Sequence, residues 1–241
     1  MKKLIILFLL APLAVFAAQN GPHLDKAPIN FHDEASLQRG ARDFTNYCLS
    51  CHSAQNVRYE LLNHIGLSNQ QIEKNLMAAG GKVGDKMKVA MRPQDAKKWF
   101  GIAPPDLGLM ARVKGPDWLY AYLRDFYRDD STQTGWNNTV YPKVAMPDVL
   151  WALQGTQVLQ SGTKIIDGRT VTIHKLVLAK PGKMTPAQYN AFVGDLVNFM
   201  TYMGQPYHNK QIDVGIVVLL FLGVLFVLVY MLKKEYWKDI H

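Results

Sequence analysis

Apolar residues are concentrated at the two ends of the chain, and the first concentration predicts a signal peptide. Two lysines precede an apolar run from Leu4 to Phe16. This run is too short to cross a bilayer as a helix. The small residues that follow it suit a signal peptidase, so we expect residues 1–17 to be a signal peptide, cleaved after Ala17 or Ala18.

The second apolar stretch predicts a transmembrane helix. Residues 214–232 contain no charged side chain, and a helix of that length covers about 28 Å, the thickness of bilayer hydrocarbon. Lysines follow the stretch, and the positive-inside rule therefore places the tail 233–241 in the cytoplasm. We expect an exported domain at 18–206, a linker at 207–213 and one membrane span. In a Gram-negative bacterium the domain lies in the periplasm and the span in the inner membrane.

Helical periodicity opens the exported domain. Leu37, Ala41, Phe44 and Cys48 recur at helical spacing, which predicts a helix with one apolar face. Gly40 lies within this helix and has no side chain, so a second helix can approach closely there.

Further elements are predicted downstream. Aromatic residues at four-residue spacing predict a helix over 117–130, and a capping box that begins at Thr185 opens a helix that continues to Met203. Alternating residues at 156–161 and 171–178 flank a turn-forming Asp-Gly pair and predict a small hairpin. The fold class is therefore mainly α with a small β-hairpin insertion.

Composition and charge exclude several classes of protein. The chain has 241 residues, 49% of them apolar and 19% charged, with two cysteines and a net charge of +8. This excludes disorder, a collagen-like fold and a disulfide scaffold. About +5 remains on the exported domain, too little and too scattered for a nucleic-acid partner. The densest basic stretch, 82–98, is interpreted as a solvated face in preference to a docking surface.

Both cysteines fall in the segment Cys48-Leu49-Ser50-Cys51-His52, the attachment pattern of c-type haem. Two thiols three residues apart reach two vinyl groups of one porphyrin, and the adjacent histidine is held beneath the iron. A thioredoxin-like site would require a preceding strand, and a zinc site would require further thiols or a close histidine pair. A structural disulfide would not call for His52.

The second axial ligand has several candidates among ten methionines and six other histidines. Met146 is favoured because Pro142 and Pro147 stiffen the loop that presents it. A core methionine is the usual alternative, and His64, His174 and His208 remain possible partners for bis-histidine ligation. A His–Met pair closes the iron to small substrates and raises the potential, which indicates electron transfer.

Taken in order, the motifs resemble the cytochrome c1 family in its proteobacterial form. The single carboxy-terminal anchor completes this pattern, which is far more specific than a haem motif alone. The matching segments run over nearly the whole mature chain: Arg39-Gly40, Cys48-Leu49-Ser50-Cys51-His52, Val57-Arg58-Tyr59, Ala103-Pro104-Pro105-Asp106-Leu107, Trp136-Asn137-Asn138 and Val144-Ala145-Met146-Pro147.

The resemblance implies the ligands of one covalently attached haem c. Cys48 and Cys51 would hold the group through thioethers. His52 would be the proximal ligand of the iron, and Met146 the distal one. In the family the Met-Pro pair is commonly followed by another proline, whereas Asp148 follows here, which changes the loop behind the ligand.

Three more residues are implied at the haem periphery. Pro105 belongs to the segment that lines the haem edge in the family. Arg112 matches an arginine that pairs with a haem propionate, and its guanidinium suits that carboxylate. Trp118 falls where the family often has an aromatic residue near the propionates.

The resemblance also implies a cytochrome c-like haem domain with one carboxy-terminal transmembrane helix. The chain would act as the electron-transfer subunit of quinol–cytochrome c reductase, which is the bc1 complex. The electron donor would be the Rieske iron–sulfur protein and the acceptor a c-type cytochrome. Cytochrome b and membrane lipid would be the other partners, within a dimeric complex. The chain would have no catalytic acid–base pair of its own. Two alternatives stay open: an anchored cytochrome that serves a terminal oxidase or nitrite reductase, and a haem sensor with an open sixth position.

Overall fold

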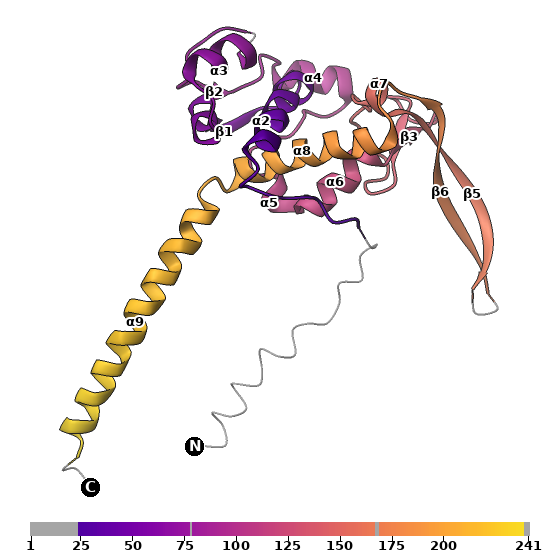
Figure 1. Cartoon of the computed structure of the whole chain (residues 1–241). Helices are drawn as coiled ribbons and strands as arrows, with labels where there is room; N and C mark the ends of the chain where they lie inside the picture. The colour runs from indigo at the N-terminus through magenta and orange to yellow at the C-terminus, as the bar shows by residue number, and fades with distance from the viewer. Residues whose placement is uncertain (1–23, 78, 167–168, 239–241) are drawn as a thin grey trace.

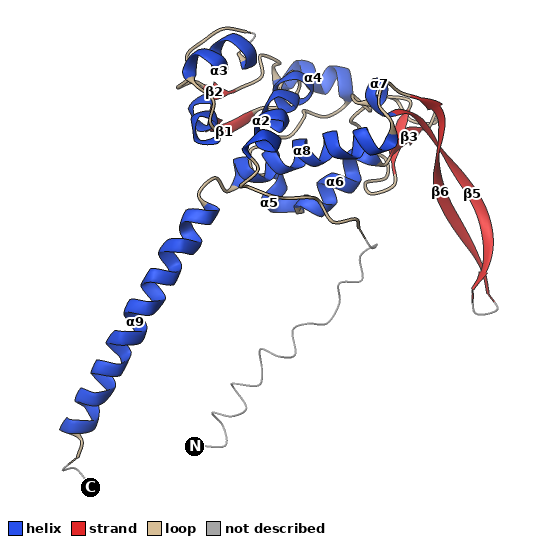
Figure 2. Cartoon of the chain, in the orientation of Figure 1, coloured by secondary structure: helices blue, strands red, loops and turns tan. Residues whose placement is uncertain are grey.

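The computed structural model describes residues 24–77, 79–166 and 169–238 (Figure 1). The signal peptide expected at 1–17 and the hairpin turn expected at 167–168 lie outside the described residues. A helical body carries one long β-hairpin and one long carboxy-terminal helix (Figure 2). The predicted fold class, mainly α with a small β component and a terminal apolar helix, is confirmed.

Two helices from opposite ends of the domain form the core. α2 (Glu34–Asp43) continues into a π-helical turn (Phe44–Cys48), and α8 (Pro186–Gly204) packs along it. At Gly40 the two helices are so close that a Cβ atom would lie 2.1 Å from the backbone oxygen of Asp195. The predicted close approach of a second helix at Gly40 is confirmed.

Both core helices begin at side-chain caps. Asp33 accepts a hydrogen bond from the backbone N–H of Ser36 at the start of α2. Thr185 and Gln188 form the reciprocal capping box at the start of α8, as the sequence predicts. α8 is buried from Phe192 to its end except at Asp195, because α2, α5 and α6 cover its different sides.

The remaining elements of the body are short, and two of its sheets contain only two strands each. In chain order these elements are β1 (Ala54–Arg58), a 3-10 turn (Tyr59–Ile65), α3 (Asn69–Leu76), β2 (Lys86–Met87), α4 (Pro93–Phe100), α5 (Met110–Lys114), α6 (Pro116–Arg124), β3 (Phe126–Arg128), β4 (Trp136–Asn138) and α7 (Trp151–Gln154).

The helix predicted over 117–130 is only half present, which corrects that prediction. α6 ends at Arg124, and the chain continues as β3, which pairs antiparallel with β4. The backbone carbonyl of Arg124 accepts hydrogen bonds from the side-chain amides of Gln154 and Gln157, at 2.6 and 2.8 Å. Side chains from a distant segment therefore occupy the acceptor that the next helical turn would use.

The predicted hairpin is present and longer than expected. β5 (Gly155–Ile166) and β6 (Arg169–Pro181) pair antiparallel along their whole length, with one irregularity near Gln157. The base of β5 contacts β3, and the rest of the hairpin projects away from the helical body (Figure 2).

The last helix, α9 (His208–Tyr236), is a single helix that leaves the body (Figure 1). The break after α8 covers only residues 205–207, so the linker expected at 207–213 is helical from His208 onward. Within the described residues, the segment Lys210–Tyr236 is long and apolar enough to cross a membrane. Its side chains are exposed on all sides, as a helix surrounded by lipid requires.

Candidate functional site

One cavity of about 400 Å³ brings together the residues that the sequence singled out. Cys48, Cys51, His52 and Met146 all line it, although Met146 comes from a distant segment of the chain. The rest of the lining is mostly apolar and aromatic. A cavity of this size and character suits a large planar cofactor held by a few polar groups.

The turn Cys48–His52 places both thiols and the imidazole at the cavity. The backbone N–H groups of Cys51 and His52 both donate to the carbonyl of Cys48, at 3.1 and 2.9 Å. Both thiols are free. Burial, reinforced by the carboxylate of Asp43, raises the pKa of the Cys48 thiol to about 12. Burial therefore favours the neutral thiol over the thiolate at this position.

The His52 ring is oriented by the backbone of the Pro-Pro segment. Its Nδ1 lies 2.7 Å from the carbonyl oxygen of Pro105, which can only accept a hydrogen bond. Nδ1 therefore carries the proton, and Nε2 keeps its lone pair for a metal. Burial lowers the pKa of His52, which favours the neutral, ligating form.

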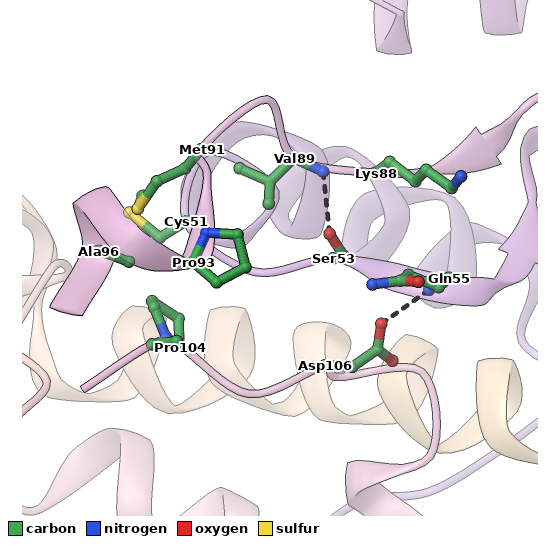
Figure 3. A pocket seen from close by; sticks show the side chains of 11 residues that line it. Cys51, Ser53, Gln55, Lys88, Val89, Met91, Pro93, Ala96, Pro104 and Asp106 are labelled. Atoms are coloured by element: carbon green, nitrogen blue, oxygen red, sulfur yellow. Dashed lines mark hydrogen bonds between the residues drawn. The ribbon is translucent and has the colours of Figure 1, made fainter.

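The Pro-Pro segment is itself fixed against the strand that follows the motif. The N–H of Leu107 donates to the carbonyl of Ser53 at 2.8 Å, and Asp106 accepts from the N–H of Gln55 at the same distance. Figure 3 shows the Asp106–Gln55 bond and a second bond from the N–H of Val89 to the Ser53 hydroxyl. The imidazole, its acceptor and the attachment turn therefore form one hydrogen-bonded unit.

Met146 lies on a loop that two asparagine side chains hold in place. Asn138 accepts from the N–H groups of Val140 and Tyr141 and donates to the carbonyl of Tyr122. Asn137 accepts from the N–H of Lys143. From sequence alone, Trp136-Asn137-Asn138 is recognised only as a family match. A pair of asparagines before a proline-containing loop was the signal for this role.

The Met146 sulfur has a hydrogen-bond donor. The hydroxyl of Tyr122 lies 3.4 Å from Sδ. The Tyr122 ring stacks on Trp118, with centroids 4.9 Å apart, and meets Phe126 edge-on at 5.1 Å. The four-residue spacing of Trp118, Tyr122 and Phe126 predicts one helix face, but nothing in that spacing connects them with Met146.

The cavity narrows the choice of a second axial ligand. Of the described residues, three methionines line it: Met110, Met146 and Met200. Met110 and Met200 belong to the same apolar cluster as Cys48, whereas Met146 packs against a separate cluster. The described histidines other than His52 do not line the cavity, so the structure does not bring His64, His174 or His208 to it.

The three peripheral residues are placed differently. Pro105 and Trp118 line the cavity. Arg112 does not line it and lies exposed on α5, where Met110 and Lys114 face the cavity instead. The Lys114 ammonium lies 5.3 Å from the centre of the Trp118 ring. Sequence reasoning missed Lys114, which no motif marks.

Comparison with known proteins decides the family. The family model described as the cytochrome C1 family matches residues 24–240. The chain belongs to the cytochrome c1 family. It is 46% identical to a cytochrome c1 from Allochromatium vinosum, over the whole of both chains. It is also 49% identical to a protein named ammonia monooxygenase gamma subunit from Nitrosomonas europaea, over 100% of this chain and 98% of that one. A mitochondrial cytochrome c1 from Saccharomyces cerevisiae shares 23% identity over 94% of this chain and 76% of its own.

Membership of the cytochrome c1 family settles the cofactor. The family provides the electron-transfer haem subunit of the bc1 complex and carries one covalently attached haem c. The residues of this structure fit that group: two free thiols, a neutral imidazole with a free Nε2 and a thioether meet in one apolar cavity.

Asp148 follows directly after the Met146-Pro147 pair. Its side chain is buried, and Oδ1 accepts a hydrogen bond from the N–H of Leu150 at 2.9 Å. Oδ2 has no hydrogen-bond partner among the described residues. Burial raises the pKa of this carboxyl to about 6. A buried carboxyl therefore follows the Met146-Pro147 pair.

Proposed function

We propose that this cytochrome c1 accepts one electron at a time from the Rieske iron–sulfur protein and passes it to a c-type cytochrome, within a bc1 complex that contains cytochrome b. The observation that carries the proposal is the meeting of Cys48, Cys51, His52 and Met146 in one apolar cavity. An aqueous active site would need polar groups placed for proton transfer, and this lining is mostly apolar.

The roles of the cavity residues follow from their chemistry. Cys48 and Cys51 would hold the haem through thioethers, and His52 would bind the iron through Nε2. Met146 would supply the second iron ligand, a thioether that comes from a different segment of the chain from His52. Met146 packs against a different cluster from Cys48, whereas Met110 and Met200 share its cluster.

Pro105, Trp118 and Arg112 support the bound group. The carbonyl of Pro105 fixes the imidazole, and the Trp118 ring forms part of the cavity wall. Arg112 would pair with a propionate at the cavity edge, since its exposed guanidinium lies on α5 two residues from Met110 and two from Lys114, both of which line the cavity.

Haem with a His–Met ligand pair supplies reversible one-electron chemistry at a raised potential. The protein excludes water with apolar and aromatic side chains, holds the imidazole in one tautomer and fills the sixth position. Oxygen or peroxide chemistry requires an open position, so this arrangement suits electron transfer. The chain acts as a subunit of the reductase without a catalytic acid–base pair.

The chain is anchored by α9, with the domain 18–206 in the periplasm and 233–241 in the cytoplasm. The apolar helix and the lysines that follow it support this orientation. Residues 1–17 serve as the signal peptide that takes the domain across the inner membrane. The complex is dimeric, as the family resemblance implies.

Replacement of Met146 by leucine tests the ligand set. We expect the haem-loaded full chain to lose about 100 mV or more of reduction potential and, once reduced, to bind carbon monoxide. The matched control is Met110→Leu, because Met110 lines the same cavity. An unchanged potential in Met146→Leu, or the same loss in Met110→Leu, would overturn the assignment. Carbon monoxide binding by the unsubstituted chain would favour a gas sensor.

Purification tests the partners separately from the ligands. We expect the full chain, extracted from its native membrane in mild detergent, to co-purify with cytochrome b and the Rieske protein. Co-purification with a terminal oxidase or nitrite reductase alone would instead identify an anchored cytochrome that serves another enzyme.

A further inference from the structure

A strongly basic face lies on the segment 82–98. Six basic side chains stand here against two acidic ones, a net charge of +4. Among the described residues, only Arg92 of the six cations forms an ion pair, with Asp95 at 2.7 Å. All six cations are exposed to solvent: Lys82, Lys86, Lys88, Arg92, Lys97 and Lys98.

The basic face adjoins the attachment site of the haem. Lys88 and Met91 line a second cavity, of about 280 Å³, together with Cys51 (Figure 3). At the other end of the segment, α4 runs into Phe100, which lines the main cavity. Cys51 lines both cavities, so the basic face borders the edge at which a thioether would hold the haem.

Large apolar side chains are exposed beside these cations. Trp99 is 61% exposed and Ile102 is 58% exposed, and Ile102 lies at the mouth of the main cavity. An exposed aromatic and aliphatic pair, rimmed by lysines and next to a redox site, has the composition of a protein–protein contact. Trp99, directly after the segment 82–98, favours a docking surface over the solvated face that the charge pattern predicts.

The α4 part of the basic face and the helix α9 lie on different sides of the helical body. In Figure 1, α4 lies at the top of the helical body, whereas α9 leaves the body at the bottom. A partner that approaches α4 from solution therefore meets neither the lipid surface nor the anchor.

We propose that the basic face around α4 docks a soluble redox partner whose surface is acidic around its own redox centre. The inference rests on the proposed function and specifies the acceptor. Opposite charges steer the encounter and align the two redox centres. The transfer moves one electron from the reduced chain to the oxidised acceptor, and no bond forms and no proton moves.

Charge reversal on α4 tests the proposal. Lys97→Glu/Lys98→Glu changes the net charge by −4 beside the cavity, and Lys175→Glu/Lys180→Glu makes the same change on exposed positions of β6. Each reduced, haem-loaded full chain is mixed by stopped flow with an acidic or a basic soluble c-type cytochrome of matched potential. Ionic strengths of about 10 mM and about 1 M bracket Debye lengths of about 30 and 3 Å.

We expect the unsubstituted chain to reduce the acidic cytochrome faster at low than at high ionic strength. The α4 variant should lose about tenfold in this rate at low ionic strength and little at high ionic strength. The β6 variant should match the unsubstituted chain. Zero-length carbodiimide coupling should join Lys97 or Lys98 to the acidic cytochrome.

Several results would overturn the proposal while the proposed function stands: faster reduction of the basic cytochrome, rates independent of salt, equal losses in both variants, or coupling of Lys97 and Lys98 to a second copy of the chain. Failure of the reduced chain to transfer an electron to either cytochrome would instead refute the proposed function.

Discussion

The two walls of the haem cavity are built in different ways. The wall that carries Cys48 and His52 rests on a large apolar cluster around α2 and α8. The wall that carries Met146 rests on a small cluster whose buried members are Phe126, Trp136 and Val144. The first wall is held by helix packing. The second is held largely by polar side chains that bond to backbone.

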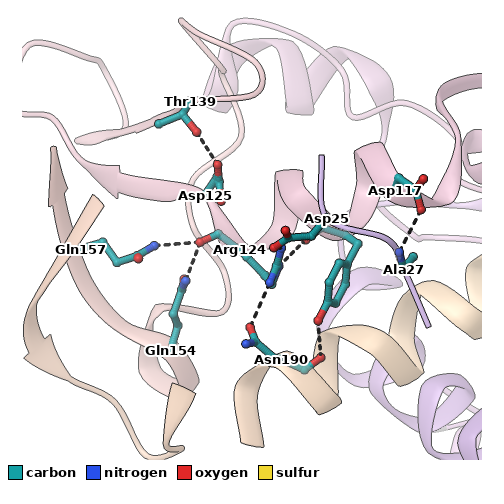
Figure 4. Close-up of polar contacts among 10 residues, drawn as sticks. Asp25, Ala27, Asp117, Arg124, Asp125, Thr139, Gln154, Gln157 and Asn190 are labelled. Atoms are coloured by element: carbon teal, nitrogen blue, oxygen red, sulfur yellow. Dashed lines mark hydrogen bonds and ion pairs between the residues drawn. The ribbon is translucent and has the colours of Figure 1, made fainter. Parts of the chain in front are cut away.

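Those polar bonds continue behind the second wall. Figure 4 shows Gln154 and Gln157 converging on the backbone carbonyl of Arg124, where α6 ends. The guanidinium of Arg124 reaches Asp25 at 2.6 Å and Asn190 at 3.4 Å. One arginine therefore links the end of α6 with the amino-terminal segment and α8.

The difference separates two tasks. The attachment turn must present two sulfurs and one imidazole nitrogen in a fixed arrangement. The densely packed core beneath it holds the turn in a single position. The Met146 loop supplies a single sulfur, and hydrogen bonds from Asn137 and Asn138 hold its backbone. The buried Asp148 follows this loop directly.

Gly40→Ala should produce the largest effect, on the wall of packed helices. Alanine favours a helix over glycine by about 1 kcal/mol. The new Cβ would lie 2.1 Å from the Asp195 backbone oxygen and 2.6 Å from Cβ of Phe199, and neither atom can move without separating α2 from α8. We expect a net loss of about 3 kcal/mol in the free energy of unfolding, measured by denaturant titration of the holoprotein.

Gly84→Ala is the control for this substitution, because a Cβ at Gly84 meets nothing within 4 Å. It should change the free energy of unfolding by less than about 1 kcal/mol. If Gly40→Ala were equally mild, the close packing of α2 and α8 would not limit the stability of the first wall.

Asn138→Ala should produce an intermediate effect, on the wall held by polar bonds. Asn138 is fully buried and makes three hydrogen bonds to backbone groups. Their loss should cost about 2–3 kcal/mol and release the Met146 loop. The weak absorption band of the ferric Met–iron bond should fade well below the unfolding midpoint. A band that persists up to global unfolding would show that Asn138 does not position the loop.

The first wall was largely predictable from sequence. The stripe that ends at Cys48 has helical periodicity, and the box at Thr185 begins α8 as predicted, because both signals are local. The haem motif is also local, since its donors occupy one turn. Gly40 also predicted a long-range feature, the close approach of a second helix, because glycine has no side chain to keep that helix away.

The second wall was less predictable, because side chains from distant segments determine it. The aromatic spacing correctly grouped Trp118 with Tyr122, but the helix ends at Arg124, where amides from Gln154 and Gln157 bind its carbonyl. No local pattern announces such bonds. From sequence, the stiffness of the proline-containing loop favoured Met146 as the second iron ligand without excluding the other methionines. The cavity reduced the candidate methionines to three.

Tyr122→Phe should produce the smallest effect and the most specific one. Phenylalanine keeps the ring that stacks on Trp118 and removes only the hydroxyl, which lies 3.4 Å from Sδ of Met146. A hydrogen bond to the sulfur weakens its donation to ferric iron more than to ferrous iron, so the hydroxyl raises the potential. Its loss should lower the potential by about 40 mV, which corresponds to about 1 kcal/mol.

The measurement is a redox titration of the haem-loaded full chain, with unfolding followed in parallel. Tyr120→Phe is the matched control, because its hydroxyl donates to the carbonyl of Asn190 rather than to Met146. Equal potentials for Tyr122→Phe and the unsubstituted chain would contradict the proposed bond. A lowered potential without loss of stability would show that the second wall tunes the iron through one hydroxyl, while the first wall holds the group in place.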